Sequence, residues 1–452
     1  MKKYIKYRQT NQEFLEMVKN MANICAIPSI SEEDFENEFP FGKAVDEACN
    51  YALNLAKSFG FETYKDPQNR FGYVQIGRGG KQIGILAHLD VVPAGDESQW
   101  ISNAFSPIIT ETELFGRGSL DDKGPAIINL YAMKYIKDNH LLSDEWSIRL
   151  IFGLSEETTM KSMKCYLKEF EAPYISYTPD GEWPLIYAEK MVYHVNLKFP
   201  KIKNIEFNGG DVINQIPDTL YIKNIDAAIL KNLNQPDFQI LESNQIVVKG
   251  KSGHGSTPDK GDNAILKALK AIINNPDYQE YELIKFIKQS FNGNFELANI
   301  FKNYEDTSGK LSANLGMIRT TNDKYILSFD LRVPVSHSKE EVSKDWETYL
   351  NQFNNQVQYE LIGHKPAKYI AKNNKLVKIL MDTYNESYNA KEEPLAIGGG
   401  TYARLLDTCV AFGSTKEMHL MHGANEAFSF KEMKESLEIY INALNRLQEY
   451  DE

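Results

Sequence analysis

Short runs of Ile, Val and Leu alternate with helical segments over the first 190 residues of the chain. The runs at 72–76, 82–87 and 147–152 are bounded by glycine or charged residues, as buried strands are. Apolar residues recur at helical spacing around these runs, at 10–24, 41–59, 125–137 and 158–168. Because strands alternate with helices, this part is predicted to be α/β, with a mixed, largely parallel sheet flanked by helices.

The pattern changes in the middle of the chain. Strand-like pieces at 193–199, 219–222, 245–249 and 325–332 occur among predicted helices at 225–233, 262–275, 280–292 and 339–353. Such a mixture is typical of an α+β domain with antiparallel sheets. After it, helices at 374–388 and 431–450 enclose strand-like runs at 395–400 and 409–413. A chain of 452 residues is also long enough for two domains.

Composition excludes some classes of function. The formal net charge is −12, without long runs of one sign, which argues against a nucleic-acid or anionic-membrane surface. Residues 1–20 contain no apolar core, and no stretch approaches the ~18 apolar residues that span a bilayer. The four cysteines lack paired spacing and are expected to be free thiols. The protein is therefore predicted to be cytoplasmic, without nucleic-acid or membrane partners.

Acidic and histidine residues gather where predicted strands end. His88 and Asp90 follow one strand directly, and Glu156 and Glu157 follow another. Three further candidates lie elsewhere in the chain: Asp121 before a helix, Asp180 in Thr-Pro-Asp-Gly, and His422 in Met-His-Gly-Ala-Asn-Glu. In open α/β sheets, ligands bind beyond the carboxyl ends of the strands, so these segments can converge on one pocket.

Two histidines and three carboxylates suit a pair of divalent ions, with positions left for water. Asp121 is expected to bridge the ions. Glu156, beside the ligand Glu157, can stay free of metal and take a proton from water. Asp90 is placed to accept the second imidazole N–H of His88 and orient the ring. Each signal alone has a structural alternative, such as a helix start for Glu-Glu or a turn for Asp-Gly; their joint occurrence favours the site.

Several longer stretches occur in the order found in one enzyme family. They are His88-Leu-Asp-Val-Val-Pro-Ala-Gly, Gly116-Arg-Gly-Ser-Leu-Asp-Asp-Lys-Gly-Pro, Ile151-Phe-Gly-Leu-Ser-Glu-Glu-Thr, Tyr177-Thr-Pro-Asp-Gly-Glu-Trp-Pro, Gly250-Lys-Ser-Gly-His-Gly-Ser-Thr-Pro, Gly398-Gly-Gly-Thr-Tyr-Ala-Arg and His422-Gly-Ala-Asn-Glu. Over nearly its whole length the chain resembles the M20 metallopeptidases, and specifically their bacterial dipeptidase branch.

The resemblance implies roles for the candidate residues. Asp121 bridges two ions, His88 and Asp180 complete one site, and Glu157 and His422 complete the other. Glu156 is the general base and acid. The peptide bond between Asp121 and Asp122 is expected to be cis. The catalytic domain is expected to comprise residues 1–190 and 371–452, with residues 191–370 inserted between them as a lid.

The resemblance also places Asn214, His254 and Arg332 of the lid at the substrate. His254 can donate a hydrogen bond to the developing oxyanion, and Arg332 can grip a free C-terminal carboxylate. Without the resemblance, the alternative for His254 is a loop histidine that caps the following helix, and the alternative for Arg332 is a surface ion pair on a strand. Gly399, Gly400 and Thr401 are expected at the substrate because glycine allows close backbone approach; a tight turn into a helix is compatible with the same residues.

The chain departs from the family pattern at two places. Ser155 stands where the family usually has aspartate, and Gly181 follows Asp180. Both glutamates of the Ser-Glu-Glu stretch remain, so hydrolytic activity is still expected.

The expected function is metal-dependent hydrolysis of dipeptides or short peptides with a free N-terminus. Two divalent ions are expected, zinc first, with manganese or cobalt as alternatives. An N-acyl-amino-acid deacylase on the same scaffold and a catalytically silent peptide-binding relative are the alternative functions. The chain is expected to be a monomer or a homodimer.

Overall fold

The computed structural model describes residues 2–225, 237–242, 245–273, 275–291, 295–353 and 356–450. The chain divides into two compact units. Unit 1 comprises Met1–Tyr187, Ile370–Leu395 and Gly400–Glu452, and unit 2 comprises Ala188–Tyr369 and Ala396–Gly399. Within the part of the chain that the structure describes, no helix has the length and apolar character needed to cross a bilayer.

Unit 1 is built on a mixed sheet whose centre is parallel. Strand β3 (Lys81–His88) pairs in parallel with β6 (Trp146–Gly153) on one side and β7 (Ile175–Thr178) on the other, and β7 pairs in parallel with β23 (Cys409–Ala411). Antiparallel pairs continue the sheet outward. They add β1 (Glu62–Lys65) and β2 (Gly72–Ile76) beyond β6, and β8 (Ile186–Glu189) beyond β23. The last two residues of β8 belong to unit 2, where they pair with β21 (Lys368–Tyr369), and β22 (Leu395–Ile397) also pairs with β8. The predicted fold class is confirmed.

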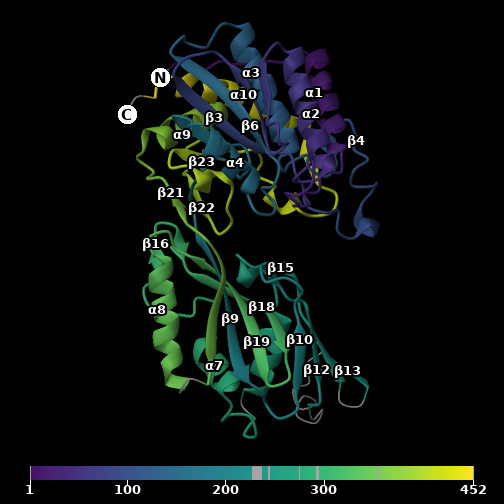
Figure 1. The fold of residues 1–452 in the computed structure, drawn as a ribbon, viewed down its shortest axis with the longest axis vertical. Helices are drawn as coiled ribbons and strands as arrows, with labels where there is room; N and C mark the ends of the chain where they lie inside the picture. Colours follow the sequence, from purple (N-terminus) through teal and green to yellow (C-terminus); the bar gives the residue numbers. More distant parts are fainter. Residues whose placement is uncertain are drawn as a thin grey trace. The chain divides into compact units, whose positions relative to one another are not determined.

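Amphipathic helices cover this sheet. They are α1 (Asn11–Cys25), α2 (Lys43–Ser58), α3 (Lys123–Asp138), α4 (Lys161–Glu169), α9 (Lys375–Tyr388) and α10 (Phe430–Leu447). Helix α3 contacts both α1 and α10 and lies against β3 (Figure 1). Most residues of α3 are buried, because this crossover helix between β3 and β6 is packed on several sides. A capping box of Thr10 and Glu13 begins α1, as the Thr-x-x-Glu pattern requires.

Short elements complete unit 1 and position its loops. A small antiparallel sheet joins β24 (Ala427–Ser429), β5 (Glu113–Phe115) and β4 (Ile108–Ile109). The 3₁₀ turns are η1 (Glu97–Gln99), η4 (Tyr402–Leu405) and η5 (Met418–Leu420). The pairing of β24 with β5 brings the segment after His422 beside the segment before Asp121.

Unit 2 contains an antiparallel sheet with helices on one face. The strand order is β13 (Phe238–Glu242), β14 (Gln245–Lys249), β12 (Thr219–Lys223), β10 (Glu206–Gly209), β18 (Ser312–Thr320), β19 (Lys324–Val333), β9 (Met191–Pro200) and β20 (Gln358–Lys365). Alternate residues of β9 from Tyr193 to Phe199 enter the core, as period-two strands do. Helices α6 (Ala264–Ile272), α7 (Glu282–Ser290) and α8 (Lys339–Leu350) share that core (Figure 1).

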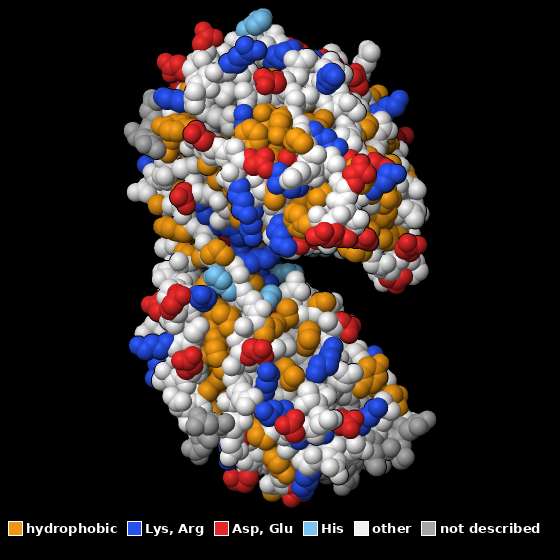
Figure 2. All heavy atoms as spheres, in the orientation of Figure 1, with side chains coloured by type: hydrophobic (Ala, Val, Ile, Leu, Met, Phe, Trp, Pro, Cys, Tyr) orange, Lys and Arg blue, Asp and Glu red, His pale blue; other side chains and the backbone are white. Residues whose placement is uncertain are grey.

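Two short hairpins and two 3₁₀ turns complete unit 2. They are β11 (Gln215–Ile216) with β15 (Gly253–His254), β16 (Glu305–Asp306) with β17 (Gly309–Lys310), η2 (Pro258–Lys260) and η3 (Asn351–Phe353). On the visible face of each unit, acidic and basic side chains are intermixed (Figure 2).

The predicted elements agree with the structure apart from some ends. The helix predicted at 158–168 begins at Lys161, because Met160 has a left-handed backbone with φ of 56°. The run predicted at 395–400 is strand only over Leu395–Ile397. The predicted helix at 225–233 lies, apart from Ile225, outside the described residues.

Candidate metal centre

The candidate ligands of unit 1 lie where the central parallel strands end. His88 is the last residue of β3 and pairs in register with Gly153, the last residue of β6. The loop after β6 carries Glu156 and Glu157, and the loop after β7 carries Asp180. Since these strands are neighbours and run in parallel, their carboxyl ends bring the three loops to one edge of the sheet.

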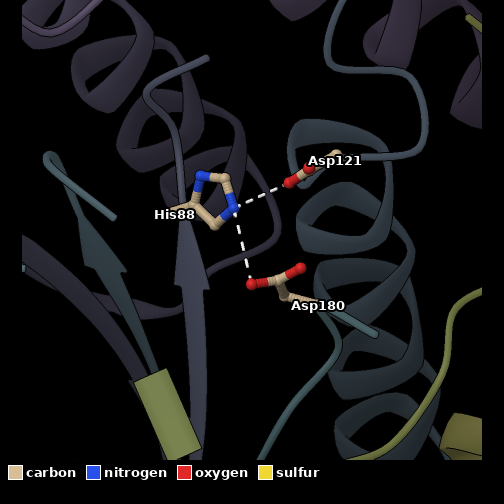
Figure 3. A group of neighbouring side chains, drawn as sticks. All are labelled: His88, Asp121 and Asp180. Carbon is tan, nitrogen blue, oxygen red and sulfur yellow. Dashed lines mark ion pairs between the residues drawn. The ribbon is translucent and has the colours of Figure 1, made fainter. Parts of the chain in front are cut away.

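Three of these side chains form a first group. Nε2 of His88 lies 2.9 Å from Oδ1 of Asp121 and 3.7 Å from Oδ2 of Asp180. Figure 3 shows both carboxylates directed toward the same ring nitrogen at the end of β3. All three residues are buried.

The second group uses the other oxygen of Asp121. Nε2 of His422 lies 3.0 Å from Oδ2 of Asp121 and 3.2 Å from Oε2 of Glu157. His422 belongs to the loop between η5 and β24, and its side chain is 54% exposed. Asp121 therefore contributes one oxygen to each group, as a carboxylate that bridges two ions does.

The spacing of these atoms fits metal ligands. Two ligand atoms that each lie ~2.1 Å from a tetrahedral ion are about 3.4 Å apart, and the separations here run from 2.9 to 3.7 Å. Nε2 of His88, Oδ1 of Asp121 and Oε1 of Glu157 are buried without a hydrogen-bond partner. A buried polar atom without a partner is costly, and a cation between these ligands would satisfy them. The donor set thus fits divalent metal.

The electrostatics of the two groups also favour bound positive charge. Burial, reinforced by the charge of Asp121, raises the pKa values of Asp180 and Glu157. Partial desolvation of the ring lowers the pKa of His422, but Asp121 and Glu157 outweigh that effect and raise the pKa to about 11. Against the effect of burial, the two histidines instead lower the pKa of Asp121. Since the pKa values of Asp180, Glu157 and His422 are all raised, the cluster has an excess of buried negative charge, which divalent cations offset.

Glu156 lies beside the two groups and belongs to neither. It is buried, and its Oε1 has no hydrogen-bond partner. Burial raises the pKa of Glu156 to about 8, and the nearby charges of Glu157, Asp90 and Asp121 act in the same direction. A carboxylate with a pKa in this range can both take and return a proton near neutral pH.

Asp90 lies beside the ring of His88 with both its backbone carbonyl and its carboxylate. Nδ1 of His88 lies 2.9 Å from the carbonyl oxygen of Asp90 and 3.5 Å from its Oδ1. The two carboxylate oxygens accept hydrogen bonds from the backbone N–H groups of Glu156, at 3.0 Å, and Glu157, at 3.1 Å. The expected contact between the carboxylate and the imidazole is therefore present at 3.5 Å, and the same carboxylate also satisfies two amides of the loop that carries both glutamates.

Sequence reasoning left three buried charged residues of this region without a role. Asp122 accepts the backbone N–H of His88 at 3.1 Å. Arg117 and Glu426 pair at 2.7 Å between the Asp121 and His422 segments. All three lie within the sequence stretches that carry Asp121 and His422, and a charged residue there that becomes buried is the signal that could have identified them. The peptide bond between Asp121 and Asp122 is cis, as the resemblance implies.

Local packing explains the glycine at position 181, whereas nothing in the structure explains serine in place of aspartate at position 155. The hydroxyl of Ser155 accepts the backbone N–H of Ser162 at 3.0 Å, near the start of α4. A Cβ at Gly181 would lie 3.0 Å from Ile186 and 3.1 Å from Ala411, so a side chain there would force its neighbours to move.

The predicted substrate residues at the glycine stretch fall in both units, with Gly399 in unit 2 and Gly400 and Thr401 in unit 1. A Cβ on Gly400 would lie 1.5 Å from the guanidinium of Arg404. Thr401 caps η4, because its hydroxyl accepts the N–H of Ala403 at 3.1 Å. For Gly400 and Thr401, the turn into a short helix is therefore sufficient to explain the residue types.

The other predicted substrate residues gather within unit 2. The carbonyl of Asn214 accepts the N–H of Gly255 at 2.7 Å, next to His254, and a Cβ on Gly255 would lie 2.8 Å from Asp330. Arg332 donates to Oδ2 of Asp330 at 2.7 Å and to the carbonyl of Gly398 at 2.5 Å. The fold thus brings the Asn214, His254 and Arg332 segments together inside one unit.

Comparisons with known proteins match most of the chain. The model for "Peptidase family M20/M25/M40" matches residues 84–446. A Staphylococcus aureus (strain USA300) protein named "putative dipeptidase" is 31% identical over 467 residues, which cover 96% of this chain and 97% of that protein.

Solved structures share the fold. Human carnosine dipeptidase 1 aligns with a TM-score of 0.59 at 13% identity, covering 97% of each chain. Aminopeptidase PepT from Bacillus cereus aligns with a TM-score of 0.59 at 15% identity, covering 96% of this chain and 99% of that one.

Proposed function

The chain belongs to peptidase family M20/M25/M40, and from that premise we propose that it is a metal-dependent dipeptidase acting on peptides with a free N-terminus. One observation carries the proposal: the two oxygens of Asp121 lie near two different histidines, each accompanied by a further carboxylate. Such a paired arrangement suits hydrolysis assisted by two ions. The dipeptidase name of the S. aureus relative supports the substrate class.

His88, Asp121 and Asp180 would hold one ion, and Asp121, Glu157 and His422 the other. Zinc is the first choice and manganese or cobalt the alternatives, because all accept mixed nitrogen and oxygen ligands. When bound, the ions would acidify a water molecule and polarise the scissile carbonyl. Proton transfer, stabilisation of the oxyanion and substrate binding would be carried out by the side chains of the protein.

Glu156 is the proposed general base. It would take a proton from the attacking water and return it to the nitrogen of the leaving amine, so the peptide bond is replaced by a carboxylate and a free amine. The raised pKa of Glu156, about 8, falls when positive charge binds nearby. Its value in the loaded enzyme would then lie closer to neutrality, where proton transfer in both directions is efficient.

His254 of unit 2 is the proposed hydrogen-bond donor to the developing oxyanion. The backbone N–H of Ser256 donates to Nδ1 of His254 at 3.2 Å. Nδ1 also lies 2.6 Å from the hydroxyl of Ser256, which can donate to it as well. With Nδ1 as the acceptor of both groups, the neutral ring would carry its proton on Nε2. That tautomer is the one that can donate to an oxyanion.

Arg332 is proposed to bind the C-terminal carboxylate of the substrate, with Asn214, Gly399, Gly400 and Thr401 contributing to the substrate site. Asp330 and Gly398 hold the guanidinium in place. The guanidinium has five N–H donors, so these two bonds do not exhaust it. In this proposal unit 1 is the catalytic domain and unit 2 the lid, and the protein acts in the cytoplasm.

The test is an assay of the purified, metal-stripped chain with unblocked dipeptides, N-acetylated dipeptides and N-acetyl amino acids. Zinc or manganese is added back, and Glu156→Gln is run beside Glu62→Gln, an exposed glutamate of β1. We expect metal-dependent cleavage of unblocked dipeptides that survives in Glu62→Gln and is lost in Glu156→Gln. Cleavage of acetylated substrates alone would indicate a deacylase. Peptide binding without turnover under either metal would indicate a silent relative.

A further inference from the structure

We propose that Arg117 and Glu426 are positioning residues that set the distance between Asp121 and His422, and with it the affinity of the second metal group. This inference rests on the proposed function, in which that group holds an ion. The two residues lie 309 positions apart in the chain, and both are almost completely buried. Neither is near enough in sequence for local structure to explain the pair.

Glu426 binds the segment that leads to the bridging aspartate. Its Oε1 accepts the backbone N–H groups of Leu120, at 2.8 Å, and Asp121, at 3.2 Å. Its Oε2 accepts the N–H of Gly118 at 3.1 Å and Nη1 of Arg117 at 2.7 Å. One carboxylate therefore accepts three backbone N–H groups between positions 118 and 121, and it holds the backbone of Asp121 directly.

Arg117 connects that segment to the histidine loop. Its Nη2 donates to the carbonyl oxygens of His422, at 3.3 Å, and Pro93, at 3.2 Å. The same guanidinium thus contacts the ligand His422 itself, the carboxylate four residues after it, and the chain that follows β3. The planar fork of arginine allows these contacts in fixed directions, which a lysine could not reproduce.

The first group depends less on this pair. His88 and Asp180 follow strands β3 and β7, and their positions come from the central sheet. His422, by contrast, lies in a loop with a left-handed backbone, φ 61°. Loss of the pair should therefore affect the ion between Asp121, Glu157 and His422 more than the ion between His88, Asp121 and Asp180.

A purely stabilising role explains the arrangement less well. A buried ion pair is often no more stabilising than well-packed apolar residues of similar volume. Here every described contact of the Glu426 carboxylate goes to the 117–121 segment, and Arg117 adds a contact to a ligand residue. Backbone pairing of β24 with β5 remains in any side-chain variant, so removing the pair tests its own contribution.

The experiment is stepwise zinc titration by calorimetry of the metal-stripped, full-length chain, with cobalt absorption spectra as a second readout of ligand geometry. The variants are Glu426→Gln, which replaces an acceptor oxygen with a donor facing N–H groups, and Arg117→Lys, which keeps the charge and loses the fork. Asp66→Asn is the matched control, since Asp66 is a buried carboxylate that accepts Arg70 Nε at 2.7 Å and the Arg70 backbone N–H at 3.0 Å.

We expect both variants to bind the weaker ion about 10- to 100-fold less tightly, with a smaller change for the tighter ion and an altered cobalt spectrum. Asp66→Asn should lower the melting temperature without changing either affinity. Two ions bound as in the unmodified chain would overturn the proposal, whatever the melting temperature. If Glu426→Gln does not fold, Arg117→Lys decides by the same criteria. An unmodified chain that binds fewer than two ions would instead refute the proposed function.

Discussion

The two candidate ligand groups share Asp121 but hold their histidines in different ways. His88 ends a central strand, is fully buried, and is fixed by bonds from its backbone N–H to Asp122 and from its ring to the carbonyl of Asp90. His422 lies in a loop, and its side chain is 54% exposed. One bridging carboxylate can therefore serve a site that the sheet preorganises and a site that depends on loop contacts, so we expect the first ion to bind tightly and the second to exchange.

The largest effect is expected for Asp121→Asn, because that substitution weakens both groups at once. We expect it to bind neither ion at micromolar metal and to lower kcat by about 10³-fold or more. Metal analysis after gel filtration, together with a dipeptide assay, checks this. A variant that keeps one ion at full affinity would show that Asp121 does not bridge.

The comparison itself is tested by His422→Ala against His88→Ala. Each variant removes one histidine and leaves the other group complete. We expect one ion per chain in both, held more tightly in His422→Ala, where the buried group remains. Dialysis against a chelator, followed by metal analysis over time, measures the difference. Equal loss from the two variants, or faster loss from His422→Ala, would contradict the proposed order.

Asp90→Asn separates two possible roles of that residue. The carbonyl that contacts His88 is retained, while one carboxylate oxygen that accepts from the Glu156 or Glu157 amide becomes a donor. We expect a 10- to 100-fold lower kcat, with the affinity of the ion at His88 nearly unchanged. A large decrease in the affinity of the ion at His88 would instead indicate that the Asp90 carboxylate acts through the imidazole of His88.

The smallest effect concerns pH. In the ion-free chain, Asp121 and Glu157 raise the pKa of His422 to about 11, and the surrounding carboxylates raise that of His88. The ring of His422 is then protonated at neutral pH, so the ion that it binds must displace a proton, and the affinity for that ion should rise with pH by about tenfold per unit. Calorimetry in buffers of different ionisation enthalpy counts the protons released. Binding without proton release would contradict the predicted protonation.

Sequence reasoning was most successful where a local pattern carries the information. The period of apolar residues predicted the helices and central strands, and ordered motifs predicted the residues His88, Asp121 and Asp180 that the fold brings together. It was less successful for side-chain partners. Asp90 was predicted to accept from the imidazole of His88, and its carboxylate lies 3.5 Å from Nδ1 of that ring. The same carboxylate also accepts two backbone N–H groups from a loop 66 and 67 residues away, which the sequence did not indicate. Spacing along the chain does not specify which buried N–H groups need an acceptor.

By itself, the sequence determined the alternation of strands and helices in unit 1, the change of pattern in unit 2, and the residue types of the candidate ligands, because hydrophobic periodicity and residue type are local properties. Only the tertiary structure decided that Asp121 directs one oxygen to each histidine and that Arg117 and Glu426 join two distant segments. Those relations arise when parallel strands place their carboxyl ends at one edge and buried polar atoms must find partners there, which no stretch of the chain specifies alone.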